Sequence, residues 1–218
     1  MTIAGAAILT IIRAIVMKVT YPKYYLIAKE MNDEDERKRY AHKAADKTYR
    51  TAYFICSSLW GWFVLKDTNI LPGFLGGMAG GDYKNVNMES IYTDYPYALI
   101  PYSFWTFGYH LQDFFQHAFL DERHNDFNEM LIHHIAAVSL YFCYTMGNMV
   151  PIGSCIAFLH DLADIPGSLC KLLNATHYQH SSAVVFVMCM CVWFYTRILC
   201  LPGMIYFIFQ QQYKGVLD

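Results

Sequence analysis

Long apolar runs without charged side chains alternate with short polar segments along this chain. No Asp, Glu, Lys or Arg lies between Glu129 and Asp161, or between Lys171 and Arg197. Each interval is long enough for the roughly 20 helical residues that cross the hydrocarbon core of a bilayer. A chain of 218 residues is too small to bury five or six such runs in a soluble core. The pattern therefore predicts a polytopic membrane protein built from helices.

Polar residues, glycines and prolines divide the apolar runs into about six predicted spans. A break is expected at Gly147–Asn148, and Pro151 then suits the first turn of the next helix. That helix is expected to kink at Pro166–Gly167, and the last run to break near Pro202–Gly203. The predicted fold class is all-α, a membrane helix bundle. Its spans are expected at 3–17, 51–65, 95–119, 127–144, 151–173 and 183–212, with polar loops at 66–94, 120–126 and 174–182.

Charge is concentrated in one segment near the N-terminus. Residues 29–50 include thirteen charged side chains and are expected to form an exposed, partly helical connector. Seven of the thirteen are Lys or Arg, against two in the loop 66–94. Because basic residues gather on the cytoplasmic side of membrane proteins, this connector is expected on the cytoplasmic or matrix side. We therefore divide the chain into residues 1–50, an N-terminal span with its connector, and residues 51–218, the membrane domain.

Composition agrees with a membrane protein. Hydrophobic residues make up 56% of the chain and charged residues only 16%, against about 25% in soluble domains. The seven cysteines lie in or beside apolar runs without CxxC spacing, which predicts neither a zinc site nor a disulfide framework. The first 29 residues are basic and contain no Asp or Glu, as in a short first span, a signal anchor or a mitochondrial transit segment. We expect no nucleic-acid partner.

Five ionisable residues lie inside the predicted spans. His133 and His134 are near the start of one span, and His160, Asp161 and Asp164 lie in the next. Spacings of three and four residues put the last three on one broad helix face. His133 and His134 are about 100° apart around their helix, so at least one can face the interior. Ionisable groups in a membrane are costly, which favours a functional interpretation.

A histidine next to an aspartate is suited to acid–base or nucleophilic chemistry. Imidazole titrates near neutral pH, so His160 can act as a base or a nucleophile while an aspartate orients it. The alternative is a satisfied polar cluster that only specifies helix packing. Five such groups in two neighbouring spans favour chemistry over packing alone.

Two spaced motifs in the centre of the chain resemble the conserved stretch of ceramide synthases. The first is DFNEMLIHHI at 126–135, and HDLAD at 160–164 follows after a separation similar to that of the family. Residues 168–174 and the pair Thr196-Arg197 resemble later family patterns. The stretch GYHLQD at 108–113 is more similar to the wider TLC-domain group. The resemblance extends over about residues 37–209.

The resemblance implies a TLC-type bundle around a polar cavity, and N-acylation of a sphingoid base by a fatty acyl-CoA. It implies His160 as nucleophile or base, oriented by Asp164, with Asp161 holding the network. His133 and His134 would then be partner acid–base or oxyanion-stabilising groups.

The resemblance also bears on substrates and location. It implies that Lys171 and Arg197 bind substrate, that acyl-CoA is a co-substrate, and that no metal or other cofactor is needed. We expect an integral membrane protein in contact with membrane lipids. The expected membrane is that of the endoplasmic reticulum, with the mitochondrial inner membrane as the alternative.

Two other functions stay open. Family members usually continue with one more long hydrophobic helix, so residues 198–213 are expected to serve as the last helix or that helix is missing. The chain would then be a non-catalytic TLC-fold subunit of a larger membrane complex, with a protein partner covering residues 198–218. A histidine-rich diiron lipid oxidoreductase is the remote alternative. His110, His117 and His124 are seven residues apart, which does not match the close histidine boxes of such sites.

Overall fold

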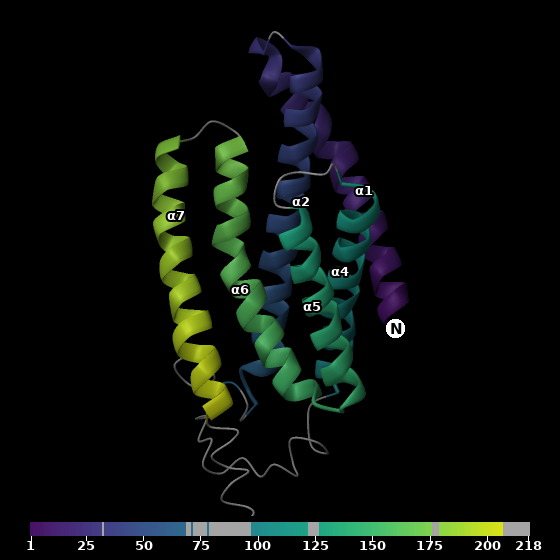
Figure 1. Ribbon diagram of the computed structural model, residues 1–218, viewed down its shortest axis with the longest axis vertical. Helices are drawn as coiled ribbons and strands as arrows, with labels where there is room; N and C mark the ends of the chain where they lie inside the picture. Colours follow the sequence, from purple (N-terminus) through teal and green to yellow (C-terminus); the bar gives the residue numbers. More distant parts are fainter. Residues whose placement is uncertain are drawn as a thin grey trace, which may run out of the picture. The chain divides into compact units, whose positions relative to one another are not determined.

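The computed structural model describes residues 1–31, 33–68, 71, 78, 97–121, 127–175 and 179–206. Every regular element in these residues is a helix (Figure 1), which confirms the all-α prediction. Most of the predicted loops 66–94 and 120–126 lie outside them, as do residues 207–218. The elements are α1 (Thr2–Ile27), η1 (Ala28–Glu30), α2 (Glu34–Leu65), α4 (Leu99–Phe119), α5 (Phe127–Met146), α6 (Val150–Ala175), α7 (Gln179–Trp193) and the π-helix η4 (Phe194–Cys200).

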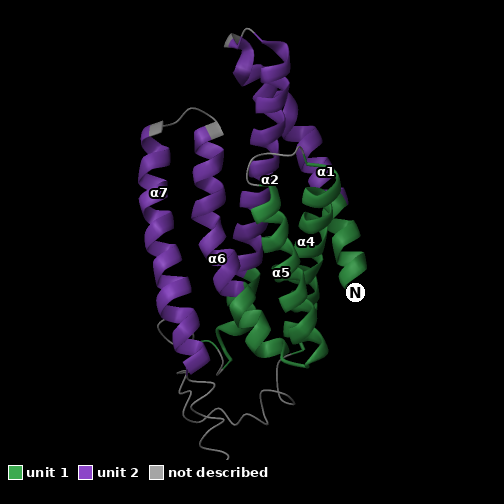
Figure 2. Ribbon diagram, viewed as in Figure 1, with its two compact units in different colours: residues 1–10, 60–157, 207–218 green, residues 11–59, 158–206 purple. Residues whose placement is uncertain are grey.

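The chain divides into two compact units, coloured separately in Figure 2. Unit 1 comprises residues 1–10, 60–157 and 207–218, and unit 2 comprises residues 11–59 and 158–206. The boundaries fall within α1, α2 and α6.

Two helical segments are long and apolar enough to cross a membrane: Thr2–Ile27, and His180–Tyr206, which includes most of α7 and all of η4. Only 6% and 11% of their most apolar stretches are buried. Most side chains in these stretches are therefore accessible, as expected of helices that face lipid and not of helices in a soluble core. The sequence predicts about six spans, and these two segments of the described chain have the length and apolarity of a span.

The predicted connector 29–50 and span 51–65 meet in one long helix, since α2 runs unbroken for 32 residues. Asp33 caps its start, because the Asp33 carboxylate accepts a 3.0 Å hydrogen bond from the backbone N–H of Asp35. Three acidic residues occupy the first turn and stabilise the positive end of the helix dipole. The aromatic, uncharged half of α2 then continues in the same helical register.

Unit 1 packs α4 against α5 and against the start of α1. Gly108 lets α1 approach α4 closely: a Cβ atom on Gly108 would lie 2.9 Å from the backbone nitrogen of Ala6. In the same unit, the ring of Tyr144 lies over Gly153, where a Cβ atom would overlap it. Glycine is thus required at both positions by a close neighbour.

The predicted break between α5 and α6 is confirmed. Asn148 adopts a positive φ of 55°, a conformation that asparagine tolerates better than most residues. The N–H of Met149 donates to the carbonyl of Tyr144 at 2.8 Å, and α6 begins at Val150. Pro151 lies in the first turn of α6, as predicted. α6 then continues through Pro166 to Ala175.

In unit 2, ionic and polar contacts join α1 to α2. Arg13 of α1 donates to the Asp46 carboxylate of α2 at 2.9 Å, and Arg50 donates to the same carboxylate at 2.9 Å. Burial by itself raises the pKa of Asp46, but Arg50, Lys47 and Arg13 outweigh burial and hold this pKa well below its usual value of 3.8. Asp46 is therefore a buried, fully ionised junction between the helices.

The polar loop predicted at 174–182 is wrong in its extent. α6 continues to Ala175 and α7 begins at Gln179, so His180 lies in the first turn of a helix. His177 lies outside the described residues. The Ser182 hydroxyl donates to the Asn174 side chain at 2.9 Å, which joins the two helix ends locally. This bond satisfies polar side chains at the two helix ends, so residues whose polarity is typical of a loop can lie in the helices.

The break predicted near Pro202–Gly203 is also wrong, because the helix continues to Tyr206. A π-helix precedes the proline, and the N–H of Leu201 bonds the carbonyl of Thr196, five residues back. The Thr196 hydroxyl donates to the carbonyl of Val192 at 2.8 Å. This wider turn changes the hydrogen-bond register just before Pro202, so the missing N–H of the proline does not end the helix.

Candidate active site

The seven residues predicted to act in chemistry or binding are divided between the two units. Unit 1 holds the histidine pair of α5, and unit 2 holds the remaining five on α6 and η4. The geometry of each set is given within its own unit. The sets are His133 and His134 in unit 1, and His160, Asp161, Asp164, Lys171 and Arg197 in unit 2.

In unit 1, the two neighbouring histidines differ in exposure. His134 is buried, with 5% of its surface exposed, whereas His133 is exposed. The Nδ1 atom of His134 lies 3.8 Å from a carboxylate oxygen of Asp113 on α4. Asp113 is also buried, at 6% exposed. His134 is therefore the member of the pair that faces the interior of unit 1, where it meets an acid that was not predicted as a site residue.

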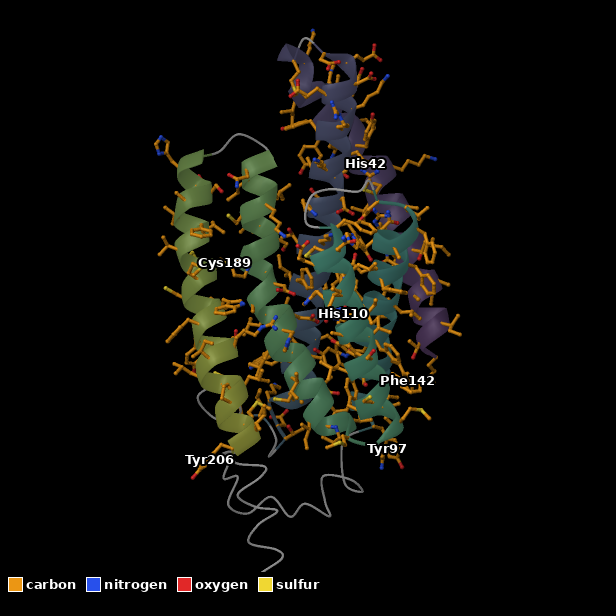
Figure 3. The ribbon with its side chains drawn as sticks, in the orientation of Figure 1. His42, Tyr97, His110, Phe142, Cys189 and Tyr206 are labelled. Atoms are coloured by element: carbon orange, nitrogen blue, oxygen red, sulfur yellow. The ribbon has the colours of Figure 1, made fainter. Side chains whose placement is uncertain are left out.

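A second histidine and a second aspartate lie beside this pair. The rings of His117 and His134 are 5.2 Å apart between centroids. The Nδ1 atom of His117 lies 3.4 Å from the Asp121 carboxylate, and its Nε2 atom lies 3.1 Å from the carbonyl oxygen of Phe127. His110, labelled in Figure 3, lies in the middle of α4. The centroid of its ring is 4.6 Å from that of the Tyr141 ring on α5. Histidine and aspartate thus recur along the α4–α5 interface.

In unit 2, Asp161 is completely buried, with none of its surface exposed. One carboxylate oxygen accepts a 2.5 Å hydrogen bond from the hydroxyl of Ser57 on α2. The other oxygen, Oδ1, is buried and has no hydrogen-bond partner among the described residues. This bond is at the short end of the range for hydrogen bonds between two oxygen atoms. The site therefore holds one oxygen of Asp161 in place and leaves the other able to accept from a ligand.

The π-helix presents Arg197 to α6. The Arg197 guanidinium lies 3.9 Å from the carboxylate of Asp164. On α6, Asp164 lies one helical turn after His160 and Asp161. His160 is half-buried. Because π-helical turns are rare and occur often at functional sites, the position of Arg197 in η4 supports a functional role. The proposed orientation of His160 by Asp164 stays a prediction.

Lys171 is exposed near the end of α6, and its positive charge acts on Lys47 of α2. Burial, followed by the charges of Arg50 and Lys171, lowers the pKa of the Lys47 ammonium group. The surroundings of Lys47 thus contain an excess of positive charge.

Ser57 and Asp113 are site neighbours that were not predicted from the sequence. Asp113 carried a signal, because an acid in an apolar predicted span is costly and unusual. Ser57 carried none, since a serine in a helix satisfies its hydroxyl locally as often as across helices.

No group of three or more His, Cys, Asp or Glu side chains is placed to hold a metal ion in the part of the chain that the structure describes. His124, which the diiron alternative counts, lies outside that part.

Comparison with known proteins identifies the family. Residues 43–218 match the TLC domain. Mouse ceramide synthase 4 is 37% identical over 83 residues, which cover 38% of this chain and 21% of the relative. The ceramide synthase hyl-2 of Caenorhabditis elegans is 25% identical over 174 residues, which cover 77% of this chain and 48% of the relative. The chain thus spans about half or less of the length of these relatives. It belongs to the TLC-domain family, and the relatives that it matches are named ceramide synthases.

Proposed function

We propose that this protein is an N-acyltransferase that joins a fatty acyl group from acyl-CoA to the amine of a sphingoid base. One observation carries the proposal above the others: the wholly buried Asp161, with one oxygen held by Ser57, directly follows His160. A buried carboxylate is costly unless it has a partner, and substrate amines are good partners for carboxylates. The family and its relatives named ceramide synthase support the same reaction.

The reaction requires a free amine that attacks the thioester carbonyl carbon. A C–N bond forms, the C–S bond breaks, and CoA leaves as the thiol. His160 takes the proton that the amine loses, or accepts the acyl group first and passes it on. In this proposal Asp161 Oδ1 accepts a hydrogen bond from the incoming amine, because that oxygen has no partner among the described residues. His133 and His134 remain proposed acid–base or oxyanion groups.

Two cationic residues of unit 2 suit the co-substrate. Arg197 balances the charge of Asp164, and the exposed ammonium of Lys171 is suited to phosphate groups of CoA. The proposed chemistry uses acyl-CoA as co-substrate and no other cofactor. No step of it requires a metal ion.

We propose an integral membrane protein with about six spans, in the endoplasmic reticulum. The exposed apolar faces of Thr2–Ile27 and His180–Tyr206 support contact with lipid. A lipid environment also suits the two substrates, since each has a long hydrocarbon chain.

An N-acylation assay tests the proposal. Purified protein in detergent is given a sphingoid base and a panel of acyl-CoAs of increasing chain length, and ceramide is measured by mass spectrometry. The wild type is expected to form ceramide, and His160→Ala at least about 100-fold less, since a positioned base contributes about 10²–10⁴ in rate. His42→Ala, which removes an exposed histidine of α2 (Figure 3), is the matched control and is expected to retain activity. Folded wild type without product would contradict the proposal.

A non-catalytic membrane subunit is the second candidate, favoured by the outward apolar side chains of the last described helix. Ile198, Leu199 and Tyr206 are 47%, 53% and 62% exposed. Such a face suits a partner helix as well as lipid. In this case folded protein forms no ceramide with any acyl-CoA, and cross-links placed at these positions join it to one specific protein in native membranes.

A further inference from the structure

We propose that Lys47, Arg50 and Lys171 form a binding site for a phosphate group in unit 2. The ligand is a phosphate monoester, carried either by the headgroup of an anionic lipid or by the ribose of CoA. The second source rests on the proposed function, whereas the site itself does not. Lys47 and Arg50 lie on α2 and Lys171 on α6, all within unit 2.

Positive charge is in excess around Lys47. Three cations share the carboxylate of Asp46. Arg13 and Arg50 each donate to it at 2.9 Å, and the Nζ atom of Lys47 lies 3.4 Å from it. Burial, followed by the charges of Arg50 and Lys171, lowers the pKa of Lys47. An anion bound at Lys47 would relieve this repulsion between like charges.

The nearest acids along α2 and α6 do not neutralise the excess. On α2, Glu36 precedes Asp46 by ten residues, or about 15 Å of helix. On α6, Asp164 precedes Lys171 by seven residues, or about 10 Å, and pairs with Arg197. Lys171 has no ion pair with any residue that the structure describes. A phosphate monoester carries about two negative charges near neutral pH, so it can balance the site.

The packing of α2 against α6 brings Lys47 and Lys171 to the same level in unit 2. The two helices run in opposite directions (Figure 1), and Ser57 of α2 bonds Asp161 of α6. Lys47 lies ten residues before Ser57 on α2. Lys171 lies ten residues after Asp161 on α6, so each lysine is about 15 Å along its helix from the same bond. One ligand can therefore contact both helices.

Both lysines have donors that a phosphate can reach. The side chain of Lys47 is 28% exposed, and its ammonium group has three N–H donors, of which the contact with Asp46 engages one. Lys171 is exposed. The spans predicted at 51–65 and 151–173 put both lysines near a membrane surface, where lipid phosphates lie. A soluble cofactor reaches the same surface from the water.

Calorimetric titration of the purified full-length protein in non-ionic detergent tests the site. One arm compares CoA with dephospho-CoA, which lacks the phosphate monoester. The other compares short-chain phosphatidic acid, a lipid with a phosphate monoester, with phosphatidylcholine. In at least one arm the monoester is expected to bind at least about 10-fold more tightly, because it adds charge-assisted hydrogen bonds. Its Kd is expected to rise with salt concentration. The arm that shows this preference identifies the source of the phosphate.

Single lysine variants locate the site. Lys47→Gln and Lys171→Gln are each expected to raise the Kd of the preferred monoester about 10-fold, as for the loss of one charge-assisted hydrogen bond. Lys38→Gln is the matched control, because it removes the same charge from α2 at an exposed ion pair with Glu34. Its Kd is expected to equal that of wild type. Melting temperatures without ligand establish that the variants are folded.

Two results overturn the site. The first is folded wild type that prefers neither monoester. The second is a Kd in Lys47→Gln or Lys171→Gln that matches the Kd of Lys38→Gln. Ceramide formation is measured separately. Wild type that binds a monoester and forms no ceramide contradicts the proposed function and supports the site, whereas wild type that forms ceramide without this preference overturns the site alone.

Discussion

Three aspartates are buried in the described part of the chain, and each meets a donor from another helix. Asp46 accepts from Arg13, Asp161 accepts from Ser57, and Asp113 faces His134. A buried carboxylate without a donor would be strongly destabilising. The three differ in what remains available: Asp46 is surrounded by cations, whereas Asp161 keeps one oxygen without a described partner. At the scale of single residues, the first therefore stabilises the fold and the second is available for chemistry.

Ser57→Ala tests the short bond to Asp161. The substitution leaves a buried carboxylate oxygen without its donor, which lowers the free energy of unfolding by about 1–3 kcal/mol. Because Asp161 would no longer be held in one orientation, kcat for N-acylation is expected to fall about 10- to 100-fold, the kinetic equivalent of about 1.4–2.7 kcal/mol. Ser57→Thr keeps a hydroxyl and is expected to retain most of the activity. The measurement is the steady-state rate at saturating acyl-CoA.

Ser58→Ala is the matched control for Ser57. The Ser58 hydroxyl is equally buried, but it has no hydrogen-bond partner among the described residues. Its removal is expected to leave the rate within about 2-fold of wild type, since no bond is lost. Equal losses in Ser57→Ala and Ser58→Ala would show that the bond to Asp161 has no special role.

Asp46→Asn tests the ionised junction of α1 and α2. The pKa of Asp46 in the folded protein is lowered below 3.8, so the carboxylate stabilises the fold at neutral pH and loses this effect as the pH falls. At pH 7 the variant is expected to be less stable by on the order of 2 kcal/mol. The difference is expected to narrow below about pH 5, where the unfolded state begins to bind the proton. Thermal unfolding in detergent from pH 7 downward gives both quantities.

Glu34→Gln is the exposed counterpart of Asp46→Asn. Glu34 pairs with Lys38 at 2.7 Å, but the two side chains are 69% and 50% exposed. An exposed pair in the same helix contributes little, because water and salt screen it. The melting temperature of Glu34→Gln is therefore expected to match that of wild type at every pH. A loss in Asp46→Asn that does not narrow at low pH would contradict the linkage to its carboxylate.

Residue types and spacing predicted the histidine pair and the HDLAD motif, but not their partners. His134 and His160 were recognisable because polar groups are rare in apolar runs. Whether Ser57 or Ser58 meets Asp161 depends on the rotation of α2 about its axis. That rotation is set by packing between helices, which the pattern along a single helix does not determine.

At the scale of elements, local signals decided some boundaries and failed at others. Gly147–Asn148 ends α5 because Asn148 takes a positive φ, a local property of the residue. Pro202 was expected to end a helix, but the π-helical turn before it changes the hydrogen-bond register. A π turn depends on bonds five residues apart and has no simple sequence signature. The close approach of α1 to α4 at Gly108 likewise depends on a neighbour far away in sequence.

Gly108→Ala tests this helix contact. Its Cβ atom would lie 2.9 Å from Ala6 N and 3.1 Å from Thr2 O, which are backbone atoms that cannot rotate away. The start of α1 must then shift, and overpacking of this kind costs about 1–3 kcal/mol. The melting temperature in detergent is expected to fall accordingly.

Gly203→Ala provides the comparison, because nothing lies within 4 Å of a Cβ atom at this helical position. Alanine favours a helix over glycine by roughly 0.5–1 kcal/mol, so this variant is expected to be as stable as wild type or slightly more stable. If both glycine variants melt at the wild-type temperature, the close contact between α1 and α4 at Gly108 is contradicted.

At the scale of the whole molecule, the two long apolar helices and the family match support a membrane protein of the TLC-domain family. Apolar runs predicted the all-helical fold, because a helix satisfies its backbone polar groups internally and lipid offers no alternative. The division into two units was not apparent in the sequence, since its boundaries fall inside continuous helices. Within the units, the candidate site residues include imidazole and carboxylate groups, which the proposed acyl transfer uses.

The most direct test of the central claim is to measure ceramide and free CoA together in one reaction of purified protein, sphingoid base and acyl-CoA. The proposed acyl transfer predicts equal molar amounts of the two products in wild type. It also predicts a loss of both by at least about 100-fold in His160→Ala, in line with the contribution of a positioned base. Release of CoA without ceramide, absence of both from folded wild type, or equal rates in the two proteins would contradict the account.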